Sequence, residues 1–130
     1  METTKQFRKR NAILAYLRQT DTHPSAEMVF NHLKTEYPDL SLGTVYRNLT
    51  LFKEQGQIMS LGTVKGIERF DANTAPHVHF ICDNCGSVDD LPDISVPEEL
   101  CRKACGENGA RVDHCWLTFS GVCNECISKN

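Results

Sequence analysis

Two Cys-x-x-Cys pairs constrain this 130-residue chain more than any other feature of its sequence. Cys82 and Cys85 form the first pair, in CDNC, and Cys123 and Cys126 form the second, in CNEC. Two intervening residues let both sulfurs of a pair face one ion at about 2.3 Å, and two pairs complete a tetrahedral cage of the structural zinc kind. The pairs stand 37 residues apart. Short zinc modules leave roughly 15–20, so this ion would join the end of a domain to its beginning.

Disulfides and a redox-active Cys-x-x-Cys are the alternatives to zinc. The chain opens with polar residues and no apolar signal segment follows, so we expect a cytoplasmic protein. Thiols stay reduced in that compartment, which favours metal binding or redox chemistry over structural disulfides.

Composition indicates a globular chain with one domain or two small ones, since 40% of the residues are hydrophobic and no run approaches the roughly 20 apolar residues of a membrane span. The net charge of −3 is distributed unevenly. Residues 1–56 hold eight basic and six acidic residues, a balance of +2, and residues 57–130 have a balance of −5. The two halves therefore have different electrostatic roles.

Three helices are predicted in that first half. An amphipathic segment carries Phe7, Ile13, Leu14 and Leu17, and a second helix starts at Pro24-Ser25-Ala26 and ends at Pro38. Ser41 is the expected N-cap of a third helix, whose apolar stripe ends before Gly56. Two strand-like runs, 57–61 and 67–70, follow as a β-wing, so the pattern predicts a winged helix-turn-helix.

The third helix carries hydroxyl, aromatic, guanidinium and amide groups that its apolar stripe does not use, which are groups that contact phosphates and base edges. Polar residues are also expected on any solvated helix face. The nearby basic cluster at residues 8–10 favours DNA binding. The candidate DNA-binding residues are Arg10, Thr44, Tyr46, Arg47 and Asn48.

A second set of possible metal ligands lies near the first cysteine pair. His77 and His79 alternate in an apparent strand and so face the same side, with Asp71 upstream and Asp90 downstream. Imidazoles and carboxylates suit Fe(II), Mn(II) or Zn(II). The alternative is an ordinary polar loop with surface histidines and turn-forming aspartates.

The order of the motifs HPSAEMVF, SLGTVYRNLTLF, RFD, HVHFICDNCG and GVCNEC resembles the ferric uptake regulator family of metal-dependent bacterial repressors, from about residue 7 to residue 127. The resemblance implies an α+β fold, with a winged helix-turn-helix in residues 1–71 and a small α/β dimerisation domain in residues 72–130. It implies a homodimer bound to an AT-rich palindromic operator in double-stranded DNA. The sequence itself gives no sign of enzymatic turnover, since it shows no phosphate-binding Gly loop, no nucleophile with an evident base and no cofactor fingerprint. The resemblance also implies structural Zn²⁺ at the four paired cysteines and a regulatory site at His23, Asp71, His77, His79 and Asp90.

Asp at positions 71 and 90 resembles the peroxide-responsive branch of the family, whereas iron-sensing members usually carry Glu there. In that branch, the resemblance implies, Fe²⁺ reacts with hydrogen peroxide and the oxidant modifies ligand histidines, here His23 and His77. Mn²⁺ fills the same site without that reactivity. The alternatives are an iron- or zinc-responsive repressor without oxidation chemistry and, from another class, a thiol oxidoreductase.

Other residues depart from the family pattern. The N-terminal arm is short, and an additional metal site of other members is expected to be absent, because Val78 and Cys115 replace its acid and histidine. Cys101, Cys105 and Cys115 lie outside the zinc pattern, either as small buried hydrophobes or as a thiol or metal site. His32 is expected to be an exposed helix residue, and His114 a structural or surface histidine.

Overall fold

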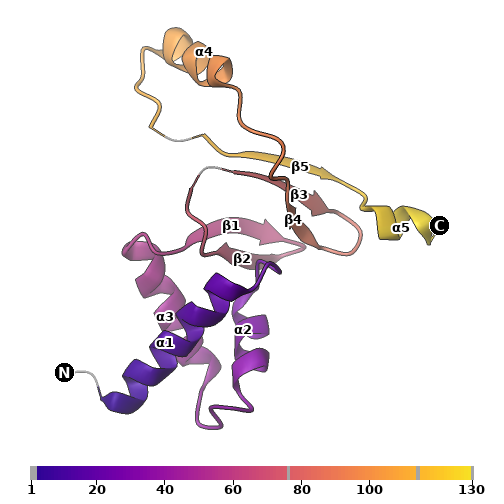
Figure 1. Cartoon of the computed structure of the whole chain (residues 1–130). Coiled ribbons are helices and arrows are strands. Elements are labelled where there is room, and N and C mark those ends of the chain that lie inside the picture. Colours follow the sequence, from indigo (N-terminus) through magenta and orange to yellow (C-terminus); the bar gives the residue numbers. More distant parts are fainter. Residues whose placement is uncertain (1–2, 76, 114, 130) are drawn as a thin grey trace. The chain divides into compact units, whose positions relative to one another are not determined.

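The computed structural model divides into two units, Met1–Thr74 and Ala75–Asn130 (Figure 1). It describes residues 3–75, 77–113 and 115–129, so His114 lies outside the described residues. Within those ranges, no helix is long and apolar enough to cross a membrane.

Each of the three helices of the first unit begins at a hydroxyl side chain that caps its free amides. Thr3 and Gln6 form a capping box at the start of α1 (Thr4–Gln19). Ser25 and Ser41 accept hydrogen bonds from amides in the first turns of α2 (Ala26–Leu33) and α3 (Leu42–Glu54). The Ser41 cap is as predicted, and so is the end of α3, where Gly56 has a φ of 73°. The second helix is shorter than expected, because residues 34–36 continue as turns.

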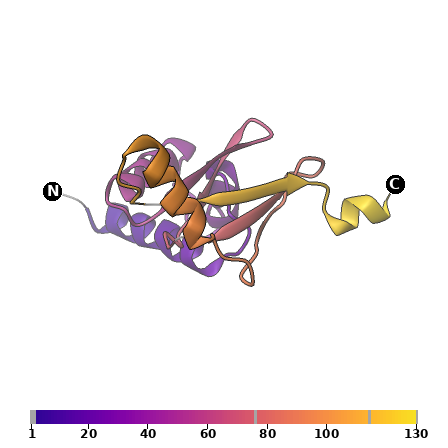
Figure 2. The same ribbon diagram turned by 90° about the horizontal axis from the view of Figure 1, so that it is seen from above.

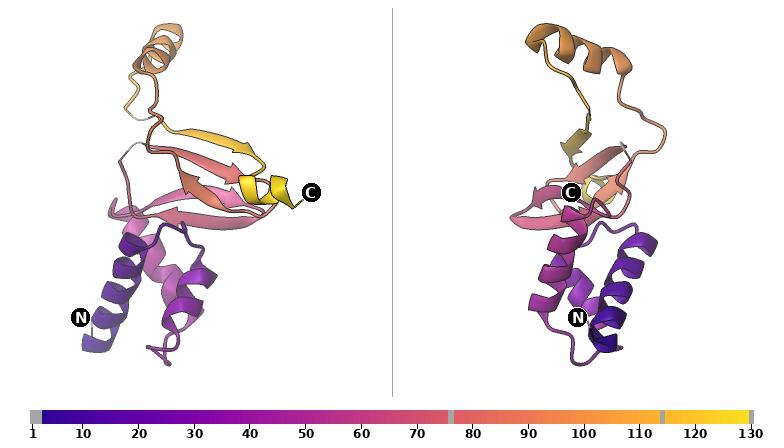
Figure 3. Two further views of the ribbon diagram at one scale, coloured as in Figure 1. Left: turned by 45° about the vertical axis from the view of Figure 1, so that its right-hand side comes forward. Right: turned by 90° about the vertical axis from the view of Figure 1, so that its left-hand side faces the viewer.

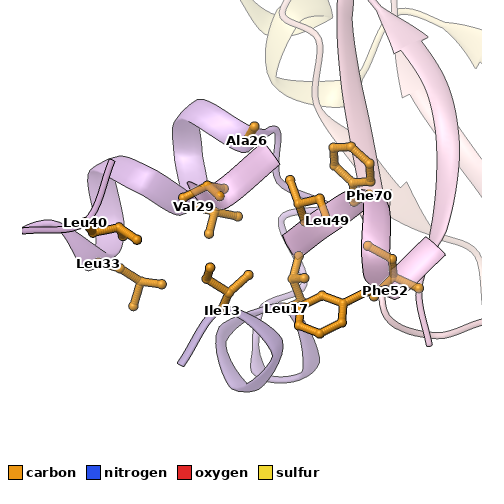
Figure 4. Close-up of a cluster of buried hydrophobic side chains, with 11 residues drawn as sticks. Ile13, Leu17, Ala26, Val29, Leu33, Leu40, Leu49, Phe52 and Phe70 are labelled. Carbon is orange, nitrogen blue, oxygen red and sulfur yellow. The ribbon is translucent and has the colours of Figure 1, made fainter. Parts of the chain in front are cut away.

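The apolar faces of these helices meet in one core, which Figure 4 shows in close-up. The predicted stripe of α3, Val45, Leu49 and Phe52, is buried in it. Phe7, which the amphipathic pattern grouped with Ile13, Leu14 and Leu17, is 55% exposed, because it lies in the first turn of α1, ahead of the buried residues Ile13 and Leu17. The other buried members of the core are Ile13, Leu17, Ala26, Val29, Leu33, Leu40, Ile58 and Phe70.

The wing is an antiparallel hairpin of β1 (Met59–Val64) and β2 (Ile67–Asp71). Its tight turn is Lys65–Gly66, where both residues have a positive φ, as a two-residue hairpin loop requires. The predicted runs 57–61 and 67–70 leave a loop over residues 62–66, but β1 begins at Met59 and continues to Val64. The register shifts between Ser60 and Thr63, so the strand does not show a simple alternation of polar and apolar residues.

The second unit is built on a three-stranded sheet in the order β4-β3-β5. β3 (Val78–Cys82) pairs antiparallel with β4 (Val88–Asp90) and parallel with β5 (Leu117–Gly121). The connection from β4 to β5 contains α4 (Glu98–Asn108). This helix lies away from the sheet and is joined to it by one segment on each side (Figure 3). β5 leads into the C-terminal α5 (Asn124–Ser128), as Figure 2 shows. The predicted α+β fold, a winged helix-turn-helix with a small α/β domain, is confirmed.

Candidate metal centres and nucleic-acid interface

The four paired cysteines converge in the second unit. Cys82 ends β3 and Cys85 lies in the following turn, while Cys123 is the N-cap of α5 and Cys126 lies within that helix. Their Sγ atoms all lie within 4.8 Å of one another. The sulfurs of Cys82 and Cys126 are 3.8 Å apart, as are those of Cys85 and Cys123. Four sulfurs at these separations match the ligand set of a tetrahedral zinc cage.

Backbone amides stabilise a thiolate in this cluster, and a thiolate is the form of cysteine that binds a cation. The amides of Cys85 and Cys123 donate to Cys82 Sγ at 3.4 and 3.3 Å, and these bonds lower the pKa of Cys82 to about 6. Asn84 favours the Cys126 thiolate, but contact with Cys123, burial and the other two thiols outweigh it and raise the pKa of Cys126 to about 11. One thiol is thus ionised at neutral pH while its neighbour keeps its proton, since adjacent thiolates repel each other without a metal ion between them.

In the first unit, His23 and Asp71 form a pair, with His23 Nε2 3.3 Å from Asp71 Oδ2. His23 has a φ of 52°, in the left-handed region that non-glycine residues seldom occupy. Such a backbone persists only where surrounding contacts hold it, and it is often found at functional sites.

Arg69 provides several of the contacts that stabilise this backbone conformation of His23. Its guanidinium donates to the carbonyl oxygens of both Thr22, at 2.6 Å, and His23. The next amide of β2, that of Phe70, donates to Pro24 O at 3.0 Å. Strand β2 therefore fixes the loop that carries His23 and also carries Asp71. The RFD motif contains Arg69 without indicating this role, and its position two residues before the candidate ligand Asp71 is the only signal in the sequence.

In the second unit, both predicted histidines reach one carboxylate. His79 is the cross-strand partner of Asp90 in the β3–β4 ladder, and His77 lies two residues earlier on the same face. The Nε2 atoms of His77 and His79 each lie 3.2 Å from Asp90 Oδ1, and their ring centroids are 4.1 Å apart.

The tautomer of His77 makes this arrangement suitable for a metal ion. Its Nδ1 lies 2.7 Å from the carbonyl oxygen of Ala75, so in the neutral ring Nδ1 donates the proton and Nε2 keeps its lone pair. A lone pair cannot donate to the Asp90 carboxylate. A divalent cation satisfies both groups, and this histidine-carbonyl bond is the usual outer contact of a metal-bound imidazole.

A polar hollow of about 440 Å³ lies between α1 and α3. Its lining includes four of the five predicted DNA-binding residues, Arg10, Thr44, Arg47 and Asn48, together with Gln6, Lys9 and Leu51. The side-chain oxygen of Asn48 accepts from Arg10 Nε at 3.0 Å, and its amide nitrogen donates to Thr44 O at 2.9 Å, so this buried residue ties the two helices together.

Tyr46, the fifth predicted residue, is 44% exposed on α3, and its hydroxyl donates to Glu27 at 2.9 Å. Lys9 is held by Asp39, whose carboxylate lies 3.1 Å from its Nζ. Lys9 belongs to the predicted basic cluster at residues 8–10, whereas Gln6 is brought to the hollow only by the packing of α1 against α3. His32 is exposed on α2, as predicted, and stacks on Tyr16.

Residues 2–120 match the model of the ferric uptake regulator family. The chain belongs to this family. The peroxide operon regulator of Bacillus subtilis is 38% identical over 123 residues, covering 93% of this chain and 83% of that protein. The peroxide-responsive repressor PerR of Staphylococcus aureus is 36% identical, with 93% and 81% covered. Among solved structures, the peroxide stress regulator of Campylobacter jejuni superposes with a TM-score of 0.79 at 27% identity over 94% of this chain and 91% of that one.

The family assignment made from the ordered motifs is thus confirmed, and the family consists of transcriptional regulators rather than enzymes. Its members bind DNA, which agrees with the winged helix-turn-helix of the first unit.

Proposed function

We propose that this chain is a metal-dependent, DNA-binding transcriptional repressor that senses peroxide through an iron or manganese site. The observation that carries the proposal is the convergence of His77 and His79 on Asp90 beside a separate four-cysteine cluster. The relatives named for peroxide regulation support the sensing role.

Two donor sets indicate two different ions. The all-sulfur cluster of Cys82, Cys85, Cys123 and Cys126 suits structural Zn²⁺. Nitrogen and carboxylate donors suit Fe²⁺ or Mn²⁺, and we assign the regulatory ligands to His23, Asp71, His77, His79 and Asp90. Two of these ligands come from the winged unit and three from the second unit. An ion that needs all five binds one arrangement of the units better than others, and so shifts the protein toward that arrangement.

Contacts within the chain hold the two histidines that are expected to be oxidised. When bound, ferrous iron supplies the electron that turns hydrogen peroxide into an oxidant able to add oxygen to an imidazole. Arg69 holds the backbone of the His23 loop, and the carbonyl oxygen of Ala75 fixes the neutral tautomer of His77 that keeps its lone pair on Nε2. An imidazole ring that gains an oxygen binds the ion less tightly. The ion is then lost and repression ends.

DNA contact is assigned to α1 and α3, through Arg10, Thr44, Tyr46, Arg47 and Asn48. The cations at the hollow suit phosphate oxygens, and the exposed face of α3 suits the major groove. We propose a cytoplasmic homodimer on an AT-rich palindrome. The second unit leaves Leu100, Trp116, Phe119, Val122 and Ile127 exposed, which a second copy would cover.

The test is oxidation at defined metal content. Protein that retains zinc is loaded anaerobically with Fe²⁺ or, as the matched control, with Mn²⁺, and one equivalent of hydrogen peroxide is added. We expect the peptides that contain His23 and His77 to gain one oxygen in the iron sample only, together with release of a DNA fragment selected from a random pool. Unmodified histidines with unchanged DNA binding would overturn peroxide sensing.

The same samples separate the alternatives. An iron- or zinc-responsive repressor would bind DNA according to the concentration of one metal and ignore peroxide. A thiol oxidoreductase would need free Cys-x-x-Cys thiolates, so tight retention of zinc by all four cysteines argues against it.

A further inference from the structure

Asn48 differs from the other polar residues that line the hollow between α1 and α3. It is 8% exposed, whereas the other polar lining residues are exposed or half-buried. A side chain that reads a base edge has to reach into a groove of the DNA. The burial of Asn48 therefore points to a role inside the protein.

Both polar atoms of the Asn48 side chain bond to protein groups. Its Oδ1 accepts from Arg10 Nε at 3.0 Å, and its Nδ2 donates to Thr44 O at 2.9 Å. The reverse orientation of the amide would place the NH2 group against the guanidinium and the oxygen against a carbonyl, so only the observed orientation satisfies both partners. An asparagine that reads adenine presents both of these atoms to the base. Asn48 would have to give up two protein hydrogen bonds to do so.

The bond to Asn48 constrains the guanidinium of Arg10. A guanidinium is planar, so a partner at Nε fixes the plane in which its other N–H groups lie. Arg10 belongs to α1 and Asn48 to α3, so a side chain of one helix orients a cation of the other. Asn48 is uncharged and leaves the charge of Arg10 in place. Lys9, at the same hollow, instead has the carboxylate of Asp39 3.1 Å from its Nζ.

We propose that Asn48 is a positioning residue, which holds the guanidinium of Arg10 for one phosphate of the DNA backbone and reads no base itself. The inference rests on the proposed DNA-binding function and narrows the role of Asn48 within it. A guanidinium that is already oriented loses less side-chain freedom when it binds a phosphate. Phosphates are present in every sequence, so Asn48 contributes to affinity for DNA and not to the choice of operator.

The test is a double-mutant cycle on full-length, Mn²⁺-loaded protein, with DNA binding followed by fluorescence anisotropy at several salt concentrations. One duplex is the fragment selected from a random pool, and the other is an unrelated sequence of the same length. Arg10→Ala should weaken binding to both about 10-fold and make the slope of log affinity against log salt shallower by about one. Asn48→Leu should weaken binding to both duplexes by no more than Arg10→Ala does. Added to Arg10→Ala, it should change affinity by less than about twofold.

A second variant tests the same contact without changing the buried residue. Arg10→Lys keeps the charge but has no Nε–H group for Asn48 to hold, so it should lose most of the affinity that Arg10→Ala loses. The matched control is Asn31→Leu, on the exposed side of α2, where Asn31 Oδ1 also accepts from a cation, Lys34 Nζ, at 3.1 Å. This change should leave both affinities as they are.

The outcomes separate three roles for Asn48. A loss confined to the selected duplex, with an unchanged salt slope, would make Asn48 a base-reading residue and overturn the proposal. An equal loss from Asn48→Leu with and without Arg10→Ala would make it a purely structural residue, and wild-type affinity of Arg10→Lys would show that orientation is unimportant; either result also overturns it. In all of these cases the wild-type chain still binds DNA. A wild-type chain that binds neither duplex would overturn the proposed repressor function as well.

Discussion

His79 and Asp90 lie directly opposite each other in the β3–β4 ladder, with His79 Nε2 3.2 Å from Asp90 Oδ1. The same hairpin carries the first cysteine pair, because Cys82 ends β3 and the turn that leads to β4 contains Cys85. The amide of Cys82 donates to Ser87 O at 2.9 Å, which closes that turn. A zinc ion at the cysteines would therefore fix the register that sets His79 against Asp90. The cysteine cluster thus supports the histidine site as well as the fold.

Asp90 is expected to be essential for the regulatory ion. Asp90→Asn removes the carboxylate charge that two Nε2 atoms share, and we expect Mn²⁺ affinity to fall more than about 100-fold, beyond the usual effect of losing an outer-shell contact. The matched control is Asp89→Asn, because Asp89 pairs with Phe80 and points to the other face of the sheet. Titration with Mn²⁺, followed by the electron paramagnetic resonance of the free ion, gives both affinities. Equal losses in the two variants would contradict the assignment.

Arg69 is expected to position His23 rather than to bind metal. Arg69→Lys keeps the charge but cannot donate to the carbonyls of Thr22 and His23 in the same fork, so the loop of His23 loses one anchor. We expect Mn²⁺ affinity to fall about 10-fold, since a hydrogen bond from a charged group contributes about 1.5–3 kcal/mol. Lys53→Gln removes a neighbouring cation from the exposed pair with Glu68 and should change affinity little. If both variants bind Mn²⁺ as the wild-type chain does, the positioning role of Arg69 is wrong.

Zinc affinity should rise with pH, with a break near the pKa of Cys82. Above pH 6 that thiol is ionised, because its pKa is lowered to about 6, whereas Cys126, with a pKa raised to about 11, must release a proton when zinc binds. Below about pH 6 Cys82 must release one as well, so affinity should fall more steeply there, by about one additional proton per zinc. Competition with a chromogenic chelator between pH 5 and 8 measures the slope. A slope that does not steepen below pH 6 would contradict this role for Cys82.

Local patterns predicted most of the fold. Spacing alone indicated the cysteine cage, and the Ser41 cap, the stripe of α3 and Gly56 defined the third helix, because each depends on residues close in the chain. The failures have a different origin. Phe7 fits the helical period, yet its exposure depends on where α1 meets its neighbours, and the run of β1 is hidden by the bulge near Gly62. Arg69 gained a role only through its contact with His23, which lies 46 positions away in the chain.

Arg47 provides the sharpest test of the DNA-binding surface. Its guanidinium donates to Thr44 at 3.0 Å at the N-terminal end of α3 and lines the hollow with Lys9 and Arg10, so it is well placed for a phosphate. Arg47→Ala should weaken binding to operator and unrelated DNA alike, and the slope of log affinity against log salt should become shallower by about one. Arg102→Ala removes the same charge from an exposed position on α4 and should leave the slope unchanged. Fluorescence anisotropy of Mn²⁺-loaded protein from 50 to 200 mM salt compares the two. A loss confined to the operator, with an unchanged slope, would instead make Arg47 a base-reading residue.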